Sequence, residues 1–260
     1  MKDPIAHAPR PPLAYQNEDF LKGPDGRPLR ILSEYLEPLT HLRHQKVQDT
    51  VVFFGSARIQ EDGPLGKYYR EARELARLVT TWAAQFNGQT CRFVITSGGG
   101  PGIMEAANRG AMDAGGKTVG LNIGLPFEQF PNDYITPDLS LEFHYFFMRK
   151  FWFAYLAKAM VVFPGGFGTL DEMFEILTLV QTQKLAKKIA IVLYGKSYWN
   201  EVINFDALVS HGMIAADDLK LFTFAETPQE AMQYLETALL PHVETPSRET
   251  PAIAHSVKPG

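Results

Sequence analysis

The sequence predicts an α/β fold in which a Rossmann-like, doubly wound parallel sheet forms a single domain behind an N-terminal extension. Short runs of β-branched and aromatic residues alternate with stretches of helical periodicity along most of the chain. This alternation is typical of parallel strands joined by helical crossovers. Glycine-rich loops directly follow two of the runs. Ligands of such folds bind beyond the carboxyl ends of the strands, so these loops mark the candidate site.

The periodicity of the apolar residues places each element. Strands are expected at 50–55, 92–97, 117–123, 159–164, 188–194 and 221–224. Helices are expected at 65–86, 102–114, 143–159, 170–183, 197–209 and 228–240.

The ends of the chain differ in composition from its middle. Residues 1–28 are rich in proline and polar groups, so we expect them to be extended or mobile, with a helix at 29–47 ahead of the core. The sequence therefore divides into an extension at 1–46, a Rossmann-like domain at 47–243 and a tail at 244–260 that we expect to be disordered.

The composition argues against several classes of protein. The chain has 260 residues, of which 45% are hydrophobic, which suits one large core. A formal net charge of −4 argues against electrostatic binding of nucleic acid. Cys91 is the only cysteine, which excludes an intrachain disulfide and argues against a Cys-based zinc site. We find neither a membrane-length apolar run nor the apolar core of a secretory signal, so we expect a cytoplasmic protein without a membrane partner.

The loop 164–169 joins an expected strand to an expected helix and has the composition of an anion site. Gly165, Gly166 and Gly168 let the backbone turn tightly and expose several N–H groups, and the helix N-terminus adds partial positive charge. Thr169 supplies a hydroxyl donor. A second interpretation is a helix cap, because Thr169 and Glu172 have capping-box spacing. Three glycines in four positions favour the ligand, since a cap does not need them.

Two further loops have the same placement after a strand. Gly98, Gly99 and Gly100 allow a ligand to approach the main chain closely. Ile103 stands where the third glycine of a dinucleotide-binding fingerprint would fall, which argues against NAD. In the loop after the first strand, Ser56 either caps a helix or contacts the ligand, and the sequence does not decide between these roles.

Arg149 and Lys150 interrupt an otherwise aromatic helix. A buried arginine needs a partner. Three interpretations stay open: a structural salt bridge, a charge that snorkels to solvent, or an arginine that points at the site between the glycine loops.

Together these motifs resemble a known family. Residues 97–111 read SGGGPGIMEAANRGA, residues 149–150 are Arg-Lys, and residues 164–172 read PGGFGTLDE. The chain is similar to the longer type of Lonely-Guy (LOG) proteins, the cytokinin riboside 5′-monophosphate phosphoribohydrolases once labelled lysine decarboxylases. The likeness runs from about Val51 to Leu240.

The resemblance implies an enzyme that cleaves the N-glycosidic bond of AMP or N6-modified AMP to the free base and ribose 5-phosphate. It implies catalytic roles for Arg149 and Glu172, no metal, no organic cofactor, and a homodimer or higher homo-oligomer. Together, the loops and the resemblance indicate substrate-binding roles for Gly55, Ser56, Gly98, Gly99, Gly100, Met104, Lys150, Pro164, Gly165, Gly166, Gly168 and Thr169.

Base preference and catalysis itself have alternatives. Many shorter members of the family carry Met three residues before the catalytic arginine, where this chain has Phe146, so the choice between plain and prenylated adenine stays open. A non-catalytic nucleotide carrier or sensor is the alternative function, and the presence of both Arg149 and Glu172 favours the enzyme. A lysine decarboxylase would need a lysine that forms a Schiff base with pyridoxal phosphate, and no lysine stands out in that role.

Overall fold

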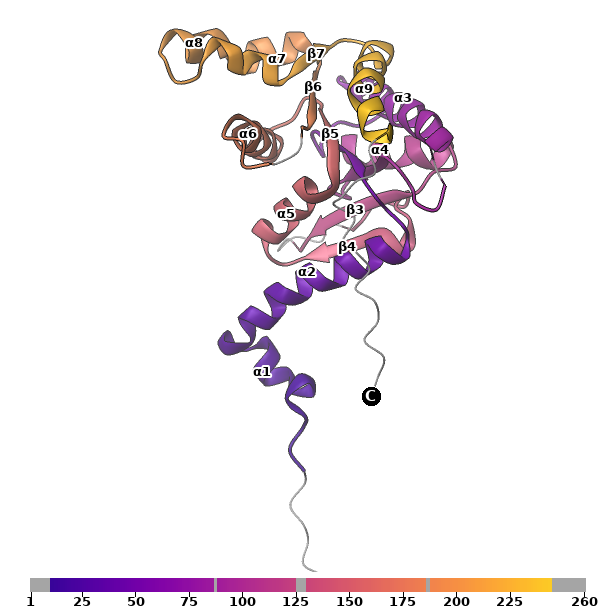
Figure 1. Cartoon of the computed structure of the whole chain (residues 1–260), viewed down its shortest axis with the longest axis vertical. Helices are drawn as coiled ribbons and strands as arrows, with labels where there is room; N and C mark the ends of the chain where they lie inside the picture. The colour runs from indigo at the N-terminus through magenta and orange to yellow at the C-terminus, as the bar shows by residue number, and fades with distance from the viewer. Residues whose placement is uncertain (1–9, 87, 125–129, 186–187, 245–260) are drawn as a thin grey trace, which may run out of the picture.

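A seven-stranded parallel sheet with helices on both faces forms the body of the protein, which confirms the expected α/β class (Figure 1). The structure is a computed structural model that describes residues 10–86, 88–124, 130–185 and 188–244. The strands lie in the order β4-β3-β2-β1-β5-β6-β7. They are β1 (Thr50–Phe54), β2 (Val94–Ser97), β3 (Thr118–Ile123), β4 (Ser140–Phe143), β5 (Ala157–Val162), β6 (Ala190–Tyr194) and β7 (Thr223–Ala225).

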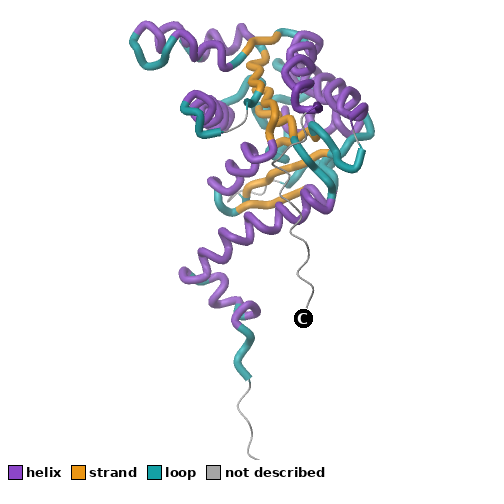
Figure 2. The backbone as a smooth tube through the Cα atoms, viewed as in Figure 1, coloured by secondary structure: helices purple, strands orange, loops and turns teal. Residues whose placement is uncertain are grey.

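Helices cover both faces of the sheet, and the backbone tube shows the strands between them (Figure 2). One face carries α3 (Gly66–Ala83), α4 (Ile103–Asp113) and α9 (Pro228–Glu244). The other carries α2 (Arg27–His44), α5 (Phe146–Leu156), α6 (Phe167–Gln181), α7 (Lys196–Val202) and α8 (Phe205–Ser210). The short helices are η1 (Ala14–Gln16), α1 (Glu18–Lys22), η2 (Pro24–Gly26), η3 (Ala84–Phe86), η4 (Pro137–Leu139) and η5 (Ala216–Leu221). Within the described ranges, no helix has the length and apolar character to cross a membrane.

Strand β1 shows how the sequence builds two cores. Val52 and Phe54 pack into the core under α5 and α6, whereas Val51 and Phe53 pack into the core under α3, α4 and α9. Alternate side chains of a strand point to opposite faces, so a strand covered on both faces must be apolar throughout. The strand order changes direction at β1, with β2 on one side and β5 on the other. This is a topological switch point, where ligands bind in such folds.

The expectation of an extended or mobile N-terminal segment is wrong for residues 14–26, which form η1, α1 and η2. Local hydrogen bonds outweigh the composition. The Asn17 side chain accepts from the Phe20 N–H at 3.2 Å and so caps α1. Arg30 on α2 donates to the carbonyls of Leu21 and Gly23. The helix expected at 29–47 is α2, but residues 1–9 and the expected disordered tail beyond residue 244 lie outside the described residues.

The long helix expected at 143–159 is also wrong in its bounds. Phe143 ends β4, a strand that the sequence did not predict, and Ala157 already belongs to β5. The backbone N–H groups of His144 and Tyr145 donate to the Glu34 carboxylate on α2, at 2.9 and 3.2 Å. These bonds turn the chain between β4 and α5. The aromatic side chains continue across the turn, so their pattern does not reveal it.

A buried ion pair fixes the amino ends of β1 and β2. Arg92 Nη2 lies 2.7 Å from Asp49 Oδ2, and both side chains are buried. The other carboxylate oxygen of Asp49 accepts from the Phe93 N–H at 2.6 Å. Phe93 has a φ of 52°, which a bulky residue rarely adopts. Asp49 therefore pairs with the positive charge of Arg92 and also stabilises the unfavourable backbone conformation of Phe93, just before β2.

We expect Asp49→Ala to lower the free energy of unfolding by about 3–5 kcal/mol, because it removes a buried carboxylate that pairs with Arg92 and accepts from the Phe93 N–H. Urea denaturation measures this change. The matched control is Glu74→Ala, which removes a half-exposed ion pair with Arg77 and should change the same quantity by less than about 1 kcal/mol. Similar small effects of both variants would contradict the structural role of Asp49.

Candidate active site

Backbone hydrogen bonds join the three loops that follow β1, β2 and β5. The Ser56 N–H donates to the Pro164 carbonyl at 3.0 Å, and the Ser56 carbonyl accepts from the Ile103 N–H at 3.1 Å. The candidate residues of all three loops therefore lie together, as the sequence predicted. The Ser56 side chain accepts from the Arg58 N–H at 3.1 Å and caps no helix, because the next helix, α3, begins only at Gly66.

The capping-box interpretation of Thr169 and Glu172 is wrong. Helix α6 begins at Phe167 with Gly166 as its N-cap, so Thr169 lies inside the first turn. The Leu170 N–H already bonds to the Gly166 carbonyl at 3.0 Å. Glu172 lies in the second turn, where no cap is formed. The Glu172 carboxylate is thus not needed to cap the N-terminus of α6.

The glycines of this loop differ in what surrounds them. A side chain at Gly165 would collide with the side chain of Thr169, so the protein itself requires a glycine there. A methyl group at Gly166 or Gly168 would meet no described protein atom within 4 Å. No side chain caps the first turn of α6 either. The open space and the free N–H groups at a helix N-terminus are the properties of an anion site. Tyr198 on α7 steadies the loop through a 2.8 Å hydrogen bond to the Gly165 carbonyl.

Glu172 carries a buried carboxylate that no described residue hydrogen-bonds. Its exposed fraction is 7%. Burial raises its pKa from 4.5 to about 7, although the positive charges of Lys150 and Arg149 act in the opposite direction. A carboxyl group with a pKa near neutrality can hold or release a proton at physiological pH, which suits acid–base and electrostatic catalysis.

Arg149 reaches from α5 to the ends of β2 and β3. Its Nε donates to the Leu121 carbonyl at 2.7 Å, and Nη2 lies 3.5 Å from the Gly98 carbonyl. Burial lowers the pKa of the guanidinium, whereas Glu172 and Glu142 raise it. Among the described residues no carboxylate forms an ion pair with Arg149, so the salt-bridge interpretation is wrong for this residue. Arg149 keeps donors free for a ligand.

Lys150 instead belongs to a salt bridge. Its Nζ lies 2.8 Å from Asp171 Oδ2 and 2.7 Å from Glu175 Oε2, both on α6. The pair of contacts ties α5 to α6 on either side of Glu172. Lys150 therefore fixes the helix that carries Arg149 relative to the helix that carries Glu172.

A pocket of about 230 Å³ opens beside Arg149. It is mainly apolar, and Arg149 and Asn122 bring polar groups to it. A side chain at Gly98 would meet the ends of the Arg149 and Met104 side chains and would displace both from the pocket wall. The lining residues are Ala57, Gly98, Met104, Asn122, Ile123, Phe130, Phe146 and Arg149.

Two asparagines that the sequence predictions missed support the candidate site. The amide nitrogen of Asn132 donates to the carbonyls of Gly99 and Gly100, both at 3.0 Å, and so holds the glycine loop. Asn132 stands in a Pro-Asn-Asp segment that reads as an ordinary turn. Asn122 carried a usable signal, because it is a polar residue inside an otherwise apolar strand.

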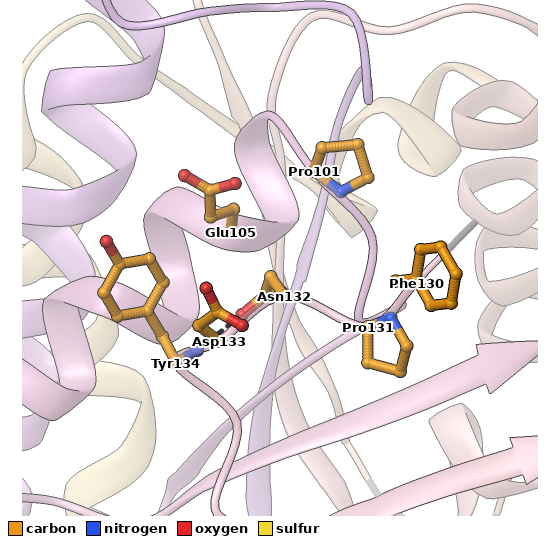
Figure 3. A pocket seen from close by; sticks show the side chains of 7 residues that line it. All are labelled: Pro101, Glu105, Phe130, Pro131, Asn132, Asp133 and Tyr134. Carbon is orange, nitrogen blue, oxygen red and sulfur yellow. Dashed lines mark hydrogen bonds between the residues drawn. The ribbon is translucent and has the colours of Figure 1, made fainter. Parts of the chain in front are cut away.

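A second pocket, of about 490 Å³, lies next to the first, and Phe130 lines both (Figure 3). Figure 3 shows Glu105, Asp133 and Tyr134 gathered at one side and Phe130 and Pro131 at the other. The Glu105 carboxylate already accepts from the Tyr69 hydroxyl at 2.6 Å. Within the described part of the chain, no His, Cys, Asp and Glu side chains group as metal ligands.

Residues 104–235 match the family described as "Possible lysine decarboxylase". The chain is 27% identical over 154 residues to the probable cytokinin riboside 5′-monophosphate phosphoribohydrolase LOGL3 of Oryza sativa subsp. japonica, covering 55% of this chain and 67% of that protein. It is 29% identical over 147 residues to the cytokinin riboside 5′-monophosphate phosphoribohydrolase LOG of the same species, covering 55% and 59%. The match thus spans two thirds or less of the length of these relatives.

A solved structure shares the fold. The X-ray structure of the structural genomics target TM1055 superposes with a TM-score of 0.51 at 23% identity, covering 73% of this chain and 99% of that one. The family match spans half of the chain and takes in Arg149, Glu172 and the loop between them. The chain belongs to the LOG family.

Proposed function

We propose that this chain is a nucleoside 5′-monophosphate phosphoribohydrolase that cleaves the N-glycosidic bond of AMP or N6-modified AMP. The observation that carries the proposal is the Glu172 carboxylate, which is buried, free of hydrogen bonds from the described residues, and close enough to Arg149 for the two charges to influence each other. A carrier that only binds nucleotide has no use for such a carboxylate. The LOG relatives named above carry the same activity in their names, which supports the proposal.

The geometry suggests how a nucleotide would lie. Its phosphate would rest on the open N–H groups at Gly166 and Gly168, and its ribose would lie over Glu172, less than two turns further along α6. The base would then extend past Arg149 into the pocket that Phe146 and Met104 line. This orientation follows the sheet from the end of β5 toward the ends of β2 and β3.

The chemistry follows from this placement. As the glycosidic bond breaks, positive charge develops on the ribose ring, and a carboxylate held beside it stabilises that charge without reorganisation. With a pKa near 7, Glu172 can also take the proton of the attacking water. Arg149 can donate to the departing base, whose nitrogen gains electron density. Arg149 and Glu172 form no ion pair with each other, so both groups stay available to the substrate.

We expect Glu172→Gln to lower turnover of AMP by about 100-fold or more, because the amide keeps the shape of the side chain and removes its charge. Release of adenine and ribose 5-phosphate, followed by chromatography, measures the effect, and AMP binding should persist. Glu175→Gln is the matched control on the same helix, since Lys150 keeps Asp171 as a partner, and it should retain most of the turnover. Near-normal turnover in a folded Glu172→Gln protein would contradict the catalytic role.

Glu172→Gln should also be more stable than the wild type at high pH but not at low pH. The pKa of Glu172 is about 7 in the folded chain against 4.5 ordinarily, so the folded wild type holds this proton more tightly than the unfolded chain does. The free energy of unfolding of the wild type therefore falls as pH rises from 4.5 through 7. Without ligand, Glu172→Gln should match the wild type near pH 4.5 and exceed it at pH 8 by up to about 3 kcal/mol. Urea denaturation at both pH values measures this, and equal stability at pH 8 would refute the buried charge.

The phosphate site predicts a substrate-dependent effect of Gly168→Ala. The new methyl group meets only open space and lies within a helix, so stability should rise by about 0.5–1 kcal/mol. The methyl group would crowd the anion, so kcat/KM for AMP should fall while the low activity on adenosine stays the same. Gly88→Ala, at another open position, is the control and should change the turnover of neither AMP nor adenosine. Equal wild-type turnover of adenosine and AMP would rule out the phosphate site.

A further inference from the structure

The side-chain amide of Asn122 has a fixed orientation near the end of β3. Its exposed fraction is 7%. Its nitrogen donates to the Leu141 carbonyl at 3.1 Å, the Ser140 hydroxyl at 3.2 Å and the Gly120 carbonyl at 3.4 Å. Backbone carbonyls can only accept, so the amide nitrogen must face β4 and the amide oxygen must face the opposite way.

The amide oxygen of Asn122 faces Gly99 in the glycine loop beside this pocket. It sits directly against Gly99, where any side chain would collide with it, and Asn122 lines the pocket together with Gly98 and Arg149. No donor in the described part of the chain bonds to this oxygen. The oxygen is not fully buried, so water can solvate it, and a ligand that displaces this water must supply a donor of its own or leave the acceptor unpaired.

The neighbouring donor is Arg149. Its Nε is bonded to the carbonyl of Leu121, the residue that precedes Asn122 in β3. The polar edge of the pocket therefore presents guanidinium donors beside an amide acceptor. A 6-aminopurine carries the complementary edge, with an N6–H donor beside a ring-nitrogen acceptor, whereas a 6-oxopurine places the acceptor O6 at the same position.

We propose that Asn122 determines base specificity: its amide oxygen accepts a hydrogen bond from the exocyclic amine of a 6-aminopurine nucleotide and disfavours 6-oxopurines. The proposal rests on the proposed function for the identity of the ligand class. An N6-monosubstituted amine retains one N–H, so Asn122 accommodates both AMP and N6-modified AMP. A nucleotide without a donor at position 6 loses the hydrogen bond, and one with an acceptor there also faces lone-pair repulsion.

The first experiment needs no variant. Four nucleotides differ at position 6: AMP, N6-methyl-AMP, purine riboside 5′-monophosphate and IMP. We measure kcat/KM and Kd of the wild type for each. N6-methyl-AMP should stay close to AMP, purine riboside 5′-monophosphate should bind about tenfold more weakly, and IMP should be the weakest, by up to about 100-fold. Equal binding of AMP and IMP would overturn the proposal.

The second experiment compares Asn122→Ala with Ser140→Ala. Asn122→Ala should lower kcat/KM and raise Kd for AMP toward the values for purine riboside 5′-monophosphate, and should leave the values for purine riboside 5′-monophosphate nearly unchanged. Ser140→Ala removes one partner of the amide nitrogen but leaves the oxygen in place, so it should preserve the ratio between the nucleotides. The ratio of wild type to variant is taken for each nucleotide, so differences in leaving-group reactivity cancel. Thermal melting shows that each variant is folded.

The outcomes separate the specificity proposal from the proposed function. If Asn122→Ala weakens all four nucleotides by the same factor, the residue is structural and the specificity proposal fails, while AMP turnover by the wild type still supports the enzyme. If the wild type releases no base from any nucleotide, the proposed function fails, and the four Kd values decide the specificity proposal alone. A preference for AMP that disappears in Asn122→Ala would then uphold it, and no preference would overturn it.

Discussion

The backbone of Ser56 is the constraint on which the candidate site depends. Strand β1 is the central element at the switch point, with β2 on one side and β5 on the other. As the chain leaves β1, Ser56 donates to Pro164 and accepts from Ile103, so one residue fixes the two glycine loops relative to each other. Both bonds are made by the backbone and do not depend on the serine side chain. The sheet topology itself thus determines the spacing between the first turn of α6 and the pocket beside β3.

The buried charges of Glu172 and Arg149 reduce the stability of the folded chain. Burial makes the ionised form of Glu172 unfavourable and also lowers the pKa of Arg149, yet the two groups form no ion pair with each other. Lys150 maintains this arrangement because it forms ion pairs with Asp171 and Glu175, on either side of Glu172, and none with Glu172 itself. The lysine therefore holds α5 against α6 while Arg149 and Glu172 stay apart. Groups held in this way are available to a ligand that lies between them.

The sequence was sufficient to predict the parallel sheet, the loops at the switch point and the proximity of their residues, because these depend on periodicity and glycine placement. It was insufficient where distant contacts decide. The turn between β4 and α5 depends on Glu34, more than a hundred residues earlier in the chain. The start of α6 at Phe167 could not be read from the spacing of Thr169 and Glu172, which fits a cap equally well. The role of Asn132 depends on a loop that only the folded chain brings beside it.

The two glycine loops look alike in the sequence and serve different purposes in the structure. Side chains of the protein itself occupy the space at Gly98 and Gly99, where Arg149, Met104 and Asn122 approach the backbone. The space beside Gly166 and Gly168 is open, so no described part of the chain requires a glycine at either position. The first loop therefore lets side chains of the candidate site approach the backbone closely, and the second loop leaves an open surface. Glycine spacing alone does not distinguish the two loops, because the sequence does not show what occupies the space beside each glycine.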